Sequence, residues 1–315
     1  MAPVNPPDLR LLDALAAERG IALVSDAPMA PLTTLRVGGV TDRLASVQDR
    51  AELLEALRLA RDAGCPSFVL GNGSDLVVAD AGIRGLVVRN RARALAVAGL
   101  RLDADAGAPM ALLVRRATAA GLAGLEFGTS IPGTLGGAVW ANAGAHGGEM
   151  GDVVASVEAW DPGGGTVSIL PGADCAFAYR ESRFKHSAEV IVSAVLTLRR
   201  DEPAEIAARV AGNQAQRVAT QPLAEQNAGS VFRNPPGDHA GRLIDAAGLK
   251  GARVGGASVS ERHANFIVAD RGTRAADVRA LGERVRAEVR DRFGVELAYE
   301  IEFVGEWPHL EGGAS

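Results

Sequence analysis

The stretch that decides the fold covers residues 128–148 and reads GTSIPGTLGGAVWANAGAHGG. Glycines interleaved with Ser, Thr and Asn leave it too little apolar surface to build a core of its own. Its apolar residues, Ile131, Leu135, Val139 and Trp140, argue against disorder. We therefore predict a backbone cradle around a bound ligand. Trp140 could stack on a ring of that ligand, but a core or surface position is the better interpretation.

A second glycine-rich loop, residues 70–75, reads LGNGSD and follows an apolar segment. Alone, it would be interpreted as a hairpin turn. A Rossmann fingerprint does not fit, because the third glycine is missing and residues 76–78 predict a strand where that motif needs a helix. A Walker A loop is excluded, because no Gly-Lys-Ser or Gly-Lys-Thr follows. Two glycine cradles in one chain predict a long ligand with a diphosphate, such as a dinucleotide.

The bulk composition limits the classes of protein to consider. The chain has 315 residues, 47% of them hydrophobic, which suits two domains or three small ones. A net charge of −5 gives no basic excess for nucleic acid. Cys65 and Cys175 lie in apolar stretches and are expected to be reduced, buried thiols. The histidines lack metal-binding spacing, so we predict no metal site. Without a signal pattern or an apolar run of ~20 residues, a cytoplasmic protein is expected.

Hydrophobic periodicity and turn residues divide the chain into predicted elements. Strands are expected within residues 67–88, 153–170, 190–198 and 297–304, and residues 121–152 are expected to be irregular. A second unit is expected to begin near residues 201–203. The predicted helices cover residues 9–18, 51–63, 109–119, 204–220 and 274–293.

Eight segments, in order, resemble the UDP-N-acetylenolpyruvoylglucosamine reductase family. Together they extend from Thr33 to Gly305, nearly the whole chain, and are far more specific than any one alone. The segments read TTLRVGG, LGNGSDLVV, GLEFGTSIPGTLGGAVWANAGAHGGE, YRESRFK, NAGSVFRNP, GRLIDAAGLKG, GASVSERHANFIV and LAYEIEFVG. The separation of Arg180 from Ser230 resembles the shorter subtype, which lacks an inserted loop.

The resemblance implies an α+β fold with a two-subdomain FAD-binding unit of the vanillyl-alcohol oxidase/p-cresol methylhydroxylase type and a C-terminal α+β substrate domain. The subdomains are expected at residues 1–96 and 97–204, and the substrate domain at 205–315, although its last strand and tail could return to the FAD unit. The implied FAD contacts are Gly71, Asn72, Gly73, Ser74, Asp75, Ser130, Ile131, Pro132, Gly133, Gly136, Gly137, Asn142 and Gly144.

The implied activity is a cytoplasmic, NADPH-dependent reduction of the enolpyruvyl ether of UDP-N-acetylglucosamine during peptidoglycan synthesis. Arg180 matches the cation that holds the substrate carboxylate, and a guanidinium suits charge that grows in the transition state. Ser230 matches the proton donor to the carbanion. Glu300 matches a glutamate that polarises the carboxylate. Glu302 shares its strand face, so only the motif spacing to Gly305 favours Glu300.

Substrate contacts are expected from residues that carry charge or hydrogen-bonding groups. Three residues depart from the family pattern: Asp75 replaces a common Asn, His146 a frequent Tyr, and Arg233 a usual Lys. The role of His263 stays open between a structural histidine and a ligand contact. The candidate substrate-binding residues are Tyr179, Arg217, Arg233, Asn234 and Lys250.

Two other functions remain as alternatives. One is an oxidase or dehydrogenase on the same flavin fold, acting on an alcohol or lactone. Such an enzyme would not need a proton donor to a carbanion, so Ser230 within NAGSVFRNP argues against it. The other is a non-catalytic flavin- or nucleotide-binding protein. The presence of Arg180, Ser230 and Glu300 together argues against that.

Overall fold

The computed structural model describes residues 7–308, and its contacts divide the chain into two compact units. The first unit contains residues 1–24, 44–72 and 86–220, and the second contains 25–43, 73–85 and 221–315. The chain passes between the units within β2 (Val40–Val47) and β5 (Ile83–Asn90). The three-domain division expected from the sequence stays a prediction.

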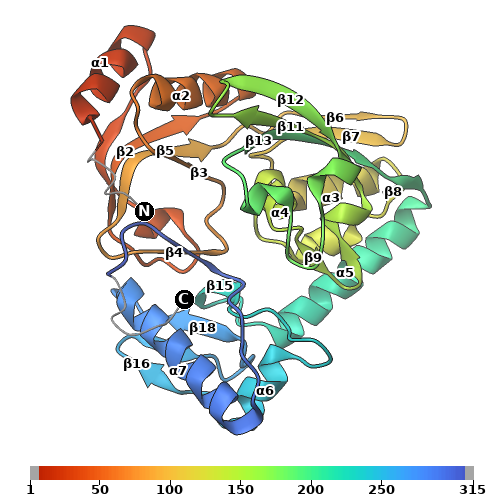
Figure 1. Ribbon diagram of the computed structural model, residues 1–315. Helices are drawn as coiled ribbons and strands as arrows, with labels where there is room; N and C mark the ends of the chain where they lie inside the picture. The colour runs from red at the N-terminus through yellow and green to blue at the C-terminus, as the bar shows by residue number, and fades with distance from the viewer. Residues whose placement is uncertain (1–6, 309–315) are drawn as a thin grey trace. The chain divides into compact units, whose positions relative to one another are not determined.

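The first unit contains a five-stranded antiparallel sheet of order β12-β11-β13-β7-β6. Helices α3 and α4 lie on one side of it in Figure 1, over a core that includes Leu102, Phe127 and Leu196. The elements are β6 (Leu95–Ala98), β7 (Arg101–Asp105), α3 (Met110–Ala119), α4 (Leu135–Trp140), β11 (Val154–Asp161), β12 (Thr166–Pro171) and β13 (Val190–Thr197).

A second core in the same unit is formed where α1 and α2 meet β3 and β5, with Leu12, Leu57 and Trp160 fully buried. β3 pairs in parallel with β5 in a four-stranded sheet of order β1-β2-β5-β3. β1 (Val24–Pro28), an edge strand of this sheet, lies almost entirely in the second unit. The remaining elements of the first unit are α1 (Leu9–Arg19), α2 (Arg50–Asp62), β3 (Ser67–Leu70), β8 (Leu122–Ala123), η2 (Glu126–Ser130), β9 (Gly144–Ala145), β10 (Gly148–Glu149), η3 (Met150–Asp152), η4 (Gly172–Cys175), η5 (Arg183–Lys185), β14 (Arg199–Arg200) and α5 (Pro203–Thr220).

The second unit packs the long helix α7 across a four-stranded sheet of order β15-β18-β17-β16 (Figure 1). Leu281, Val285 and Val289 of α7 are buried in its core. A short parallel pair, β4 with β19, completes it. The elements are η1 (Ala30–Leu32), β4 (Leu76–Val78), β15 (Gln226–Ser230), α6 (Ala240–Ala246), β16 (Arg253–Val254), β17 (Ala257–Val259), β18 (Phe266–Ala269), α7 (Ala275–Phe293) and β19 (Glu302–Val304).

The predicted helix boundaries follow local capping chemistry. Asp49 caps α2, because its carboxylate accepts a hydrogen bond from the Glu52 amide at 2.9 Å. α7 ends at Gly294, which has a left-handed φ of +68°. Pro109 was expected at the first helical position of α3 but is its N-cap.

Two predictions of secondary structure were wrong. Residues 121–152 are not irregular throughout, since they contain the helix α4. The last strand was predicted over residues 297–304 but covers only Glu302–Val304. The segment before it is held by α7, because Arg286 donates to the Leu297 carbonyl and Tyr299 donates to Glu283. These contacts replace the ladder that a longer strand would need.

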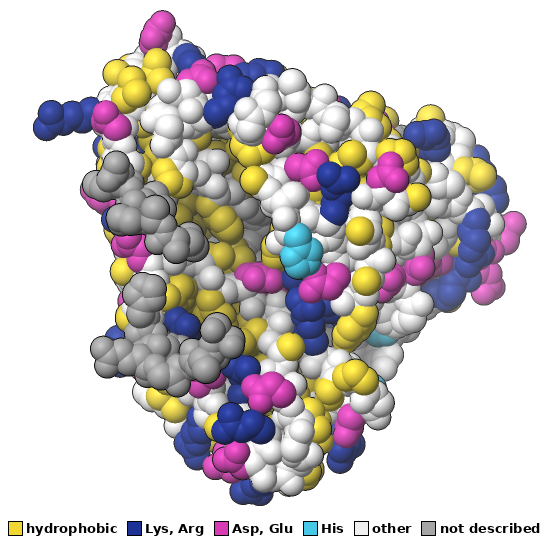
Figure 2. Space-filling view, viewed as in Figure 1, with side chains coloured by type: hydrophobic (Ala, Val, Ile, Leu, Met, Phe, Trp, Pro, Cys, Tyr) yellow, Lys and Arg dark blue, Asp and Glu magenta, His cyan; other side chains and the backbone are white. Residues whose placement is uncertain are grey.

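No helix within residues 7–308 is long and apolar enough to cross a membrane. Among the described side chains on the face drawn in Figure 2, basic and acidic groups are interspersed. That face offers no extended basic surface of the kind that attracts nucleic acid.

Replacing a glycine by alanine within a helix usually stabilises a protein, but at Gly282 in α7 we expect the opposite. A Cβ there would lie 2.5 Å from the Tyr299 hydroxyl, whose ring is stacked on Phe232. We expect Gly282→Ala to lower the free energy of unfolding by about 1–3 kcal/mol. Gly212 in α5 has nothing near its Cβ position, so Gly212→Ala should stabilise by about 0.5–1 kcal/mol. Urea unfolding of both variants measures the contrast, and stabilisation by Gly282→Ala would contradict it.

Candidate active site

The two predicted glycine loops meet within the first unit. The Asn72 side chain donates to the Pro132 carbonyl at 2.8 Å, so residues 71–72 lie directly against the segment 130–137. A Cβ on Gly71 would lie 2.5 Å from the Thr134 hydroxyl oxygen. Only glycine permits this approach without displacing Thr134, which is buried. The cradle interpretation is therefore supported by geometry as well as composition.

The start of α4 combines close backbone packing at one glycine with open space at the next. The Gly136 amide donates to the Ala106 carbonyl, and a Cβ at Gly136 would lie 2.9 Å from the Ala106 Cβ. Gly137 differs, since its Cβ position has one neighbour, the Thr134 hydroxyl at 3.9 Å. The exposed side of α4 is thus bare backbone beside a hydroxyl, the surface on which a phosphate can approach amides closely. Ser130, Ile131, Pro132 and Gly133 lead into this helix.

The rest of the first glycine loop belongs to the second unit. Gly73 has a φ of +60°, and its carbonyl accepts from the Thr34 amide at 3.0 Å. Ser74 is partly exposed. The Asp75 carbonyl accepts from the Glu302 amide at 2.9 Å.

His146 approaches the cradle, although sequence reasoning left its role open. Its Nε2 lies 2.8 Å from the Ser130 hydroxyl, and its φ is +52°. The substitution of His for the family's frequent Tyr was the signal for this contact.

Arg180 occupies a tight turn in the first unit. Ala178 and Glu181 exchange backbone hydrogen bonds of 3.0 and 2.9 Å, which places Tyr179 and Arg180 at the turn's tip. Arg180 has a φ of +56°, and its guanidinium donates to the Gly144 carbonyl at 2.9 Å. It also lies 5.4 Å from the centre of the Tyr179 ring. A partly exposed guanidinium held this way can receive a carboxylate.

Ser230 ends β15 at an irregularity of the second unit's sheet. The register of β15 against β18 shifts between Asn227 and Ser230, and Gly229 has a φ of +82°. A bulge of this kind re-aims the side chain that follows it. The partly exposed Ser230 side chain lines a pocket.

Asn265 supplies hydrogen-bond partners to the backbone that follows Ser230. Its carbonyl accepts from the Val231 amide at 2.8 Å, and its side chain both accepts from the Phe232 amide and donates to the Phe232 carbonyl. The side chain thereby mimics a neighbouring strand for a buried residue. Asn265 lies in the segment GASVSERHANFIV, and the sequence did not predict a role for it.

Glu300 lies beside the Ser230 segment. Its amide donates to the Val231 carbonyl at 2.8 Å, and the neighbouring Tyr299 ring stacks on Phe232 with centres 4.9 Å apart. Glu302 is instead in β19, where its amide binds the Asp75 carbonyl. Since Glu300 precedes the strand, strand alternation cannot place the two carboxylates on one face. The hydrogen bond from its amide to the Val231 carbonyl places Glu300, and not Glu302, next to the Ser230 segment, which favours Glu300 as the candidate catalytic glutamate.

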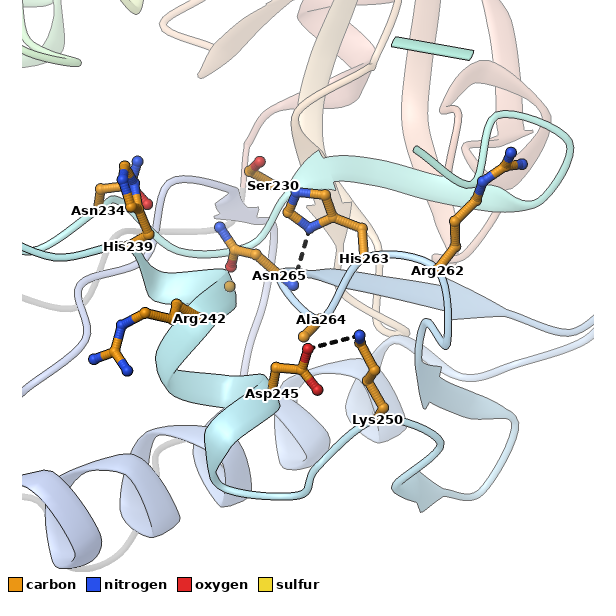
Figure 3. Close-up of a pocket in the computed structure, with 11 residues that line it drawn as sticks. Ser230, Asn234, His239, Arg242, Asp245, Lys250, Arg262, His263, Ala264 and Asn265 are labelled. Atoms are coloured by element: carbon orange, nitrogen blue, oxygen red, sulfur yellow. Dashed lines mark hydrogen bonds and ion pairs between the residues drawn. The ribbon is translucent and has the colours of Figure 1, made fainter. Parts of the chain in front are cut away.

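The pocket at Ser230 has a volume of about 370 Å³ and is lined largely by polar side chains. Lys250, ion-paired with Asp245 at 2.7 Å, forms part of its wall (Figure 3). Asn234 also lines the pocket, and its side-chain oxygen caps α6 by accepting from the Ala240 amide. The full lining is Ser230, Asn234, His239, Gly241, Arg242, Asp245, Lys250, Arg262, His263, Ala264 and Asn265.

The remaining substrate candidates are divided between the units. Tyr179 is 49% exposed at the tip of the Arg180 turn. Arg217 is near the end of α5, and burial lowers the pKa of its guanidinium from the usual value. Arg233 follows Phe232, and its amide donates to the Ala298 carbonyl. Of the candidates, Asn234 and Lys250 line the Ser230 pocket.

Within the described part of the chain, no three His, Cys, Asp or Glu side chains are grouped as metal ligands. Cys65 and Cys175 are both buried free thiols, as the sequence predicted. Burial raises the pKa of Cys175 to about 11, so it is an unreactive thiol at neutral pH.

Comparison with known proteins assigns the family. Residues 221–304 match the UDP-N-acetylenolpyruvoylglucosamine reductase C-terminal domain, and residues 41–170 match an FAD binding domain. The UDP-N-acetylenolpyruvoylglucosamine reductase of Moorella thermoacetica is 46% identical over 94% of this chain and 99% of its own length. This chain belongs to the UDP-N-acetylenolpyruvoylglucosamine reductase family.

Other members of the reductase family support the same assignment. Reductase 2 of Symbiobacterium thermophilum is 45% identical over 89% of this chain and 92% of its own length. The crystal structure of the Thermus caldophilus reductase matches with a TM-score of 0.76 and 36% identity, over 91% of this chain and 99% of that one. The resemblance drawn from the eight sequence segments is thus confirmed. The predicted α+β fold, with an FAD-binding unit and a C-terminal reductase domain, is confirmed as well.

In this reductase-family member, His263 should make stability depend on pH. Burial, and then the charge of Lys250, lowers the pKa of His263 below 6.5, and its Nδ1 accepts from the Asn265 amide at 3.2 Å. Below pH 6.5 the imidazole of residue 263 is therefore protonated more readily in the unfolded chain than in the folded protein. The free energy of unfolding consequently decreases as the pH falls below 6.5.

We expect His263→Gln to reduce this acid-side loss of melting temperature between neutral and mildly acidic pH. An unchanged slope in His263→Gln would contradict the assignment.

Proposed function

We propose that this protein is an FAD-dependent oxidoreductase acting on a CH–CH bond. It uses NADPH to reduce the enolpyruvyl ether of UDP-N-acetylglucosamine to UDP-N-acetylmuramate in the cytoplasm. This is a step of peptidoglycan precursor synthesis, and hence of cell-wall formation, cell shape and division. One observation carries the proposal: in a member of this reductase family, the Ser230 hydroxyl lines a pocket that also holds Lys250, Arg242 and Arg262. Such a pocket suits an anionic nucleotide sugar with a group that needs a proton.

The FAD site is assigned to the two glycine loops. Gly71, Asn72 and the segment 130–137 would hold the diphosphate, since their backbones approach closely and Gly137 leaves open space. Gly73, Ser74, Asp75 and Gly144 extend the proposed contacts. When bound and reduced by NADPH, FAD would supply the hydride for the terminal carbon of the enolpyruvyl double bond.

Arg180 and Glu300 would stabilise the charge that then develops on the substrate. Negative charge builds on the carbon next to the carboxylate and spreads into its oxygens. The Arg180 guanidinium can form two parallel hydrogen bonds with those oxygens, and this interaction grows stronger as the charge grows. Glu300 would hydrogen-bond the same carboxylate from beside the Ser230 segment.

Ser230 would complete the reduction by donating its hydroxyl proton to that carbon. A hydroxyl is a weak acid, but an enolate-like carbanion is basic enough to take its proton. The bulge at Gly229 and the Asn265 clamp fix where the hydroxyl points. Lys250, Asn234 and Arg233 would bind the uridine or diphosphate, with Tyr179 and Arg217 as further contacts.

The direct test is turnover by the purified yellow protein. NADPH oxidation should depend on added UDP-N-acetylglucosamine enolpyruvate and yield UDP-N-acetylmuramate. Oxidation at the same rate without that sugar would overturn the proposal.

Ser230→Ala should separate the two half-reactions. Reduction of the bound flavin by NADPH should stay nearly intact, because no proton from Ser230 is used. Reoxidation by the sugar should slow by about 10²–10⁴-fold, the range for loss of a general acid. Stopped-flow flavin absorbance measures both rates.

Ser258 in β17 does not line the Ser230 pocket and supplies the matched control. Ser258→Ala should leave both half-reactions unchanged. If Ser230→Ala slowed flavin reduction and flavin reoxidation equally, Ser230 would not be the proton donor.

A further inference from the structure

Asn142 is a fully buried polar residue whose side chain is committed to partners inside the first unit. Its Nδ2 donates to the Ala178 carbonyl at 2.8 Å and to Glu149 Oε1 at 3.0 Å. Its Oδ1 accepts from the Gly151 amide at 2.8 Å. Both N–H groups and the oxygen are therefore engaged by the protein, so its side chain has no donor left for a cofactor.

The Ala178 carbonyl is the base of the turn that carries Arg180. It accepts from the Glu181 amide across the turn and from Asn142, which uses both of its lone pairs. Arg180 sits at the turn's third position with a φ of +56°, a conformation that is unfavourable for a non-glycine residue. Such a conformation persists only where its surroundings fix it.

The guanidinium of Arg180 binds the β9–β10 hairpin, which Asn142 also contacts through Glu149. It donates to the Gly144 carbonyl, and Gly144 pairs with Glu149 in the β9–β10 hairpin. Glu149 accepts from Asn142. Asn142 is thus connected to Arg180 in two ways. It binds the turn that carries Arg180, and it binds Glu149 of the hairpin whose Gly144 carbonyl accepts from the Arg180 guanidinium. The amide sets the backbone of Arg180 and the anchor of its guanidinium relative to each other.

We propose that Asn142 is the positioning residue for Arg180. It acts through the Ala178 carbonyl and Glu149 and touches neither substrate nor flavin with its side chain. This inference rests on the proposed role of Arg180, and it replaces the cofactor contact first expected of the Asn142 side chain. Asn142 itself has a φ of +43°, which asparagine tolerates better than most residues, so Asn suits the backbone as well as the hydrogen bonds.

Asn142→Gly removes the amide while keeping a residue suited to positive φ. In the flavin-loaded protein we expect reoxidation by saturating UDP-N-acetylglucosamine enolpyruvate to slow by about 10²-fold, the effect of a misplaced reacting group. Reduction by NADPH should change little. Asn90, 5% exposed, accepts from the Ala92 amide and is the control, since Asn90→Ala should lower the melting temperature without selecting one half-reaction.

A double-mutant cycle separates positioning from a general loss of structure. In an Arg180→Ala background, Asn142→Gly should cause no further slowing of reoxidation, because the group that it positions is gone. Losses that multiply would overturn the proposal, as would equal slowing of both half-reactions by Asn142→Gly alone. If Arg180→Ala leaves reoxidation unchanged, the proposed role of Arg180 fails instead.

Asn142→Asp provides a second test that keeps the shape of the side chain. Its carboxylate would face Glu149 and the Ala178 carbonyl without a proton between them. Lowering the pH restores one donor, so reoxidation relative to wild type should recover as the pH falls. A constant ratio across pH would overturn the proposal even if Asn142→Gly fails to fold.

Discussion

Polar groups of the backbone need hydrogen-bond partners even where the chain leaves regular structure, and the two segments proposed to carry the reaction lie at such places. Arg180 is at the tip of a turn with left-handed backbone, and Ser230 follows a bulge. In each case a buried asparagine adds side-chain hydrogen bonds to the irregular backbone. Asn142 binds the Ala178 carbonyl, and Asn265 binds both backbone groups of Phe232. These hydrogen bonds help to fix irregular backbone, whose conformation persists only where its surroundings determine it.

Glycine has a different use in the proposed cofactor cradle. At Gly71 and Gly136 a side chain would collide with Thr134 or Ala106, so these glycines let backbone segments touch. Gly137 instead leaves space on the outer side of α4. Close packing on one side and bare backbone on the other describe a cradle that neither a Rossmann turn nor a P-loop would form. The glycine loop at residues 70–75 is followed by the strand β4, whereas both of those motifs require a helix there.

The sequence predicted those parts of the structure that local chemistry determines. α2 begins after Asp49 and α7 ends at Gly294, two capping residues that the sequence shows, and the composition of the glycine loops identified them. α4 was missed because Gly136 and Gly137 disfavour a helix by about 1 kcal/mol each, while packing of Leu135 and Val139 forms it anyway. The final strand was predicted too long because contacts with α7 replace its ladder. The proposed role of Asn142 and the contacts of Asn265 could not be predicted, since the carbonyls of Ala178 and Phe232 that they bind are more than thirty residues away in sequence.

The choice between a reductase and an oxidase on the same fold depends on what reoxidises the flavin. The most direct measurement is anaerobic addition of one equivalent of UDP-N-acetylglucosamine enolpyruvate to the NADPH-reduced protein, followed by flavin absorbance. We expect complete return of the oxidised spectrum without oxygen, with UDP-N-acetylmuramate formed in equal amount. A flavin that stays reduced until oxygen is admitted would contradict the proposed function.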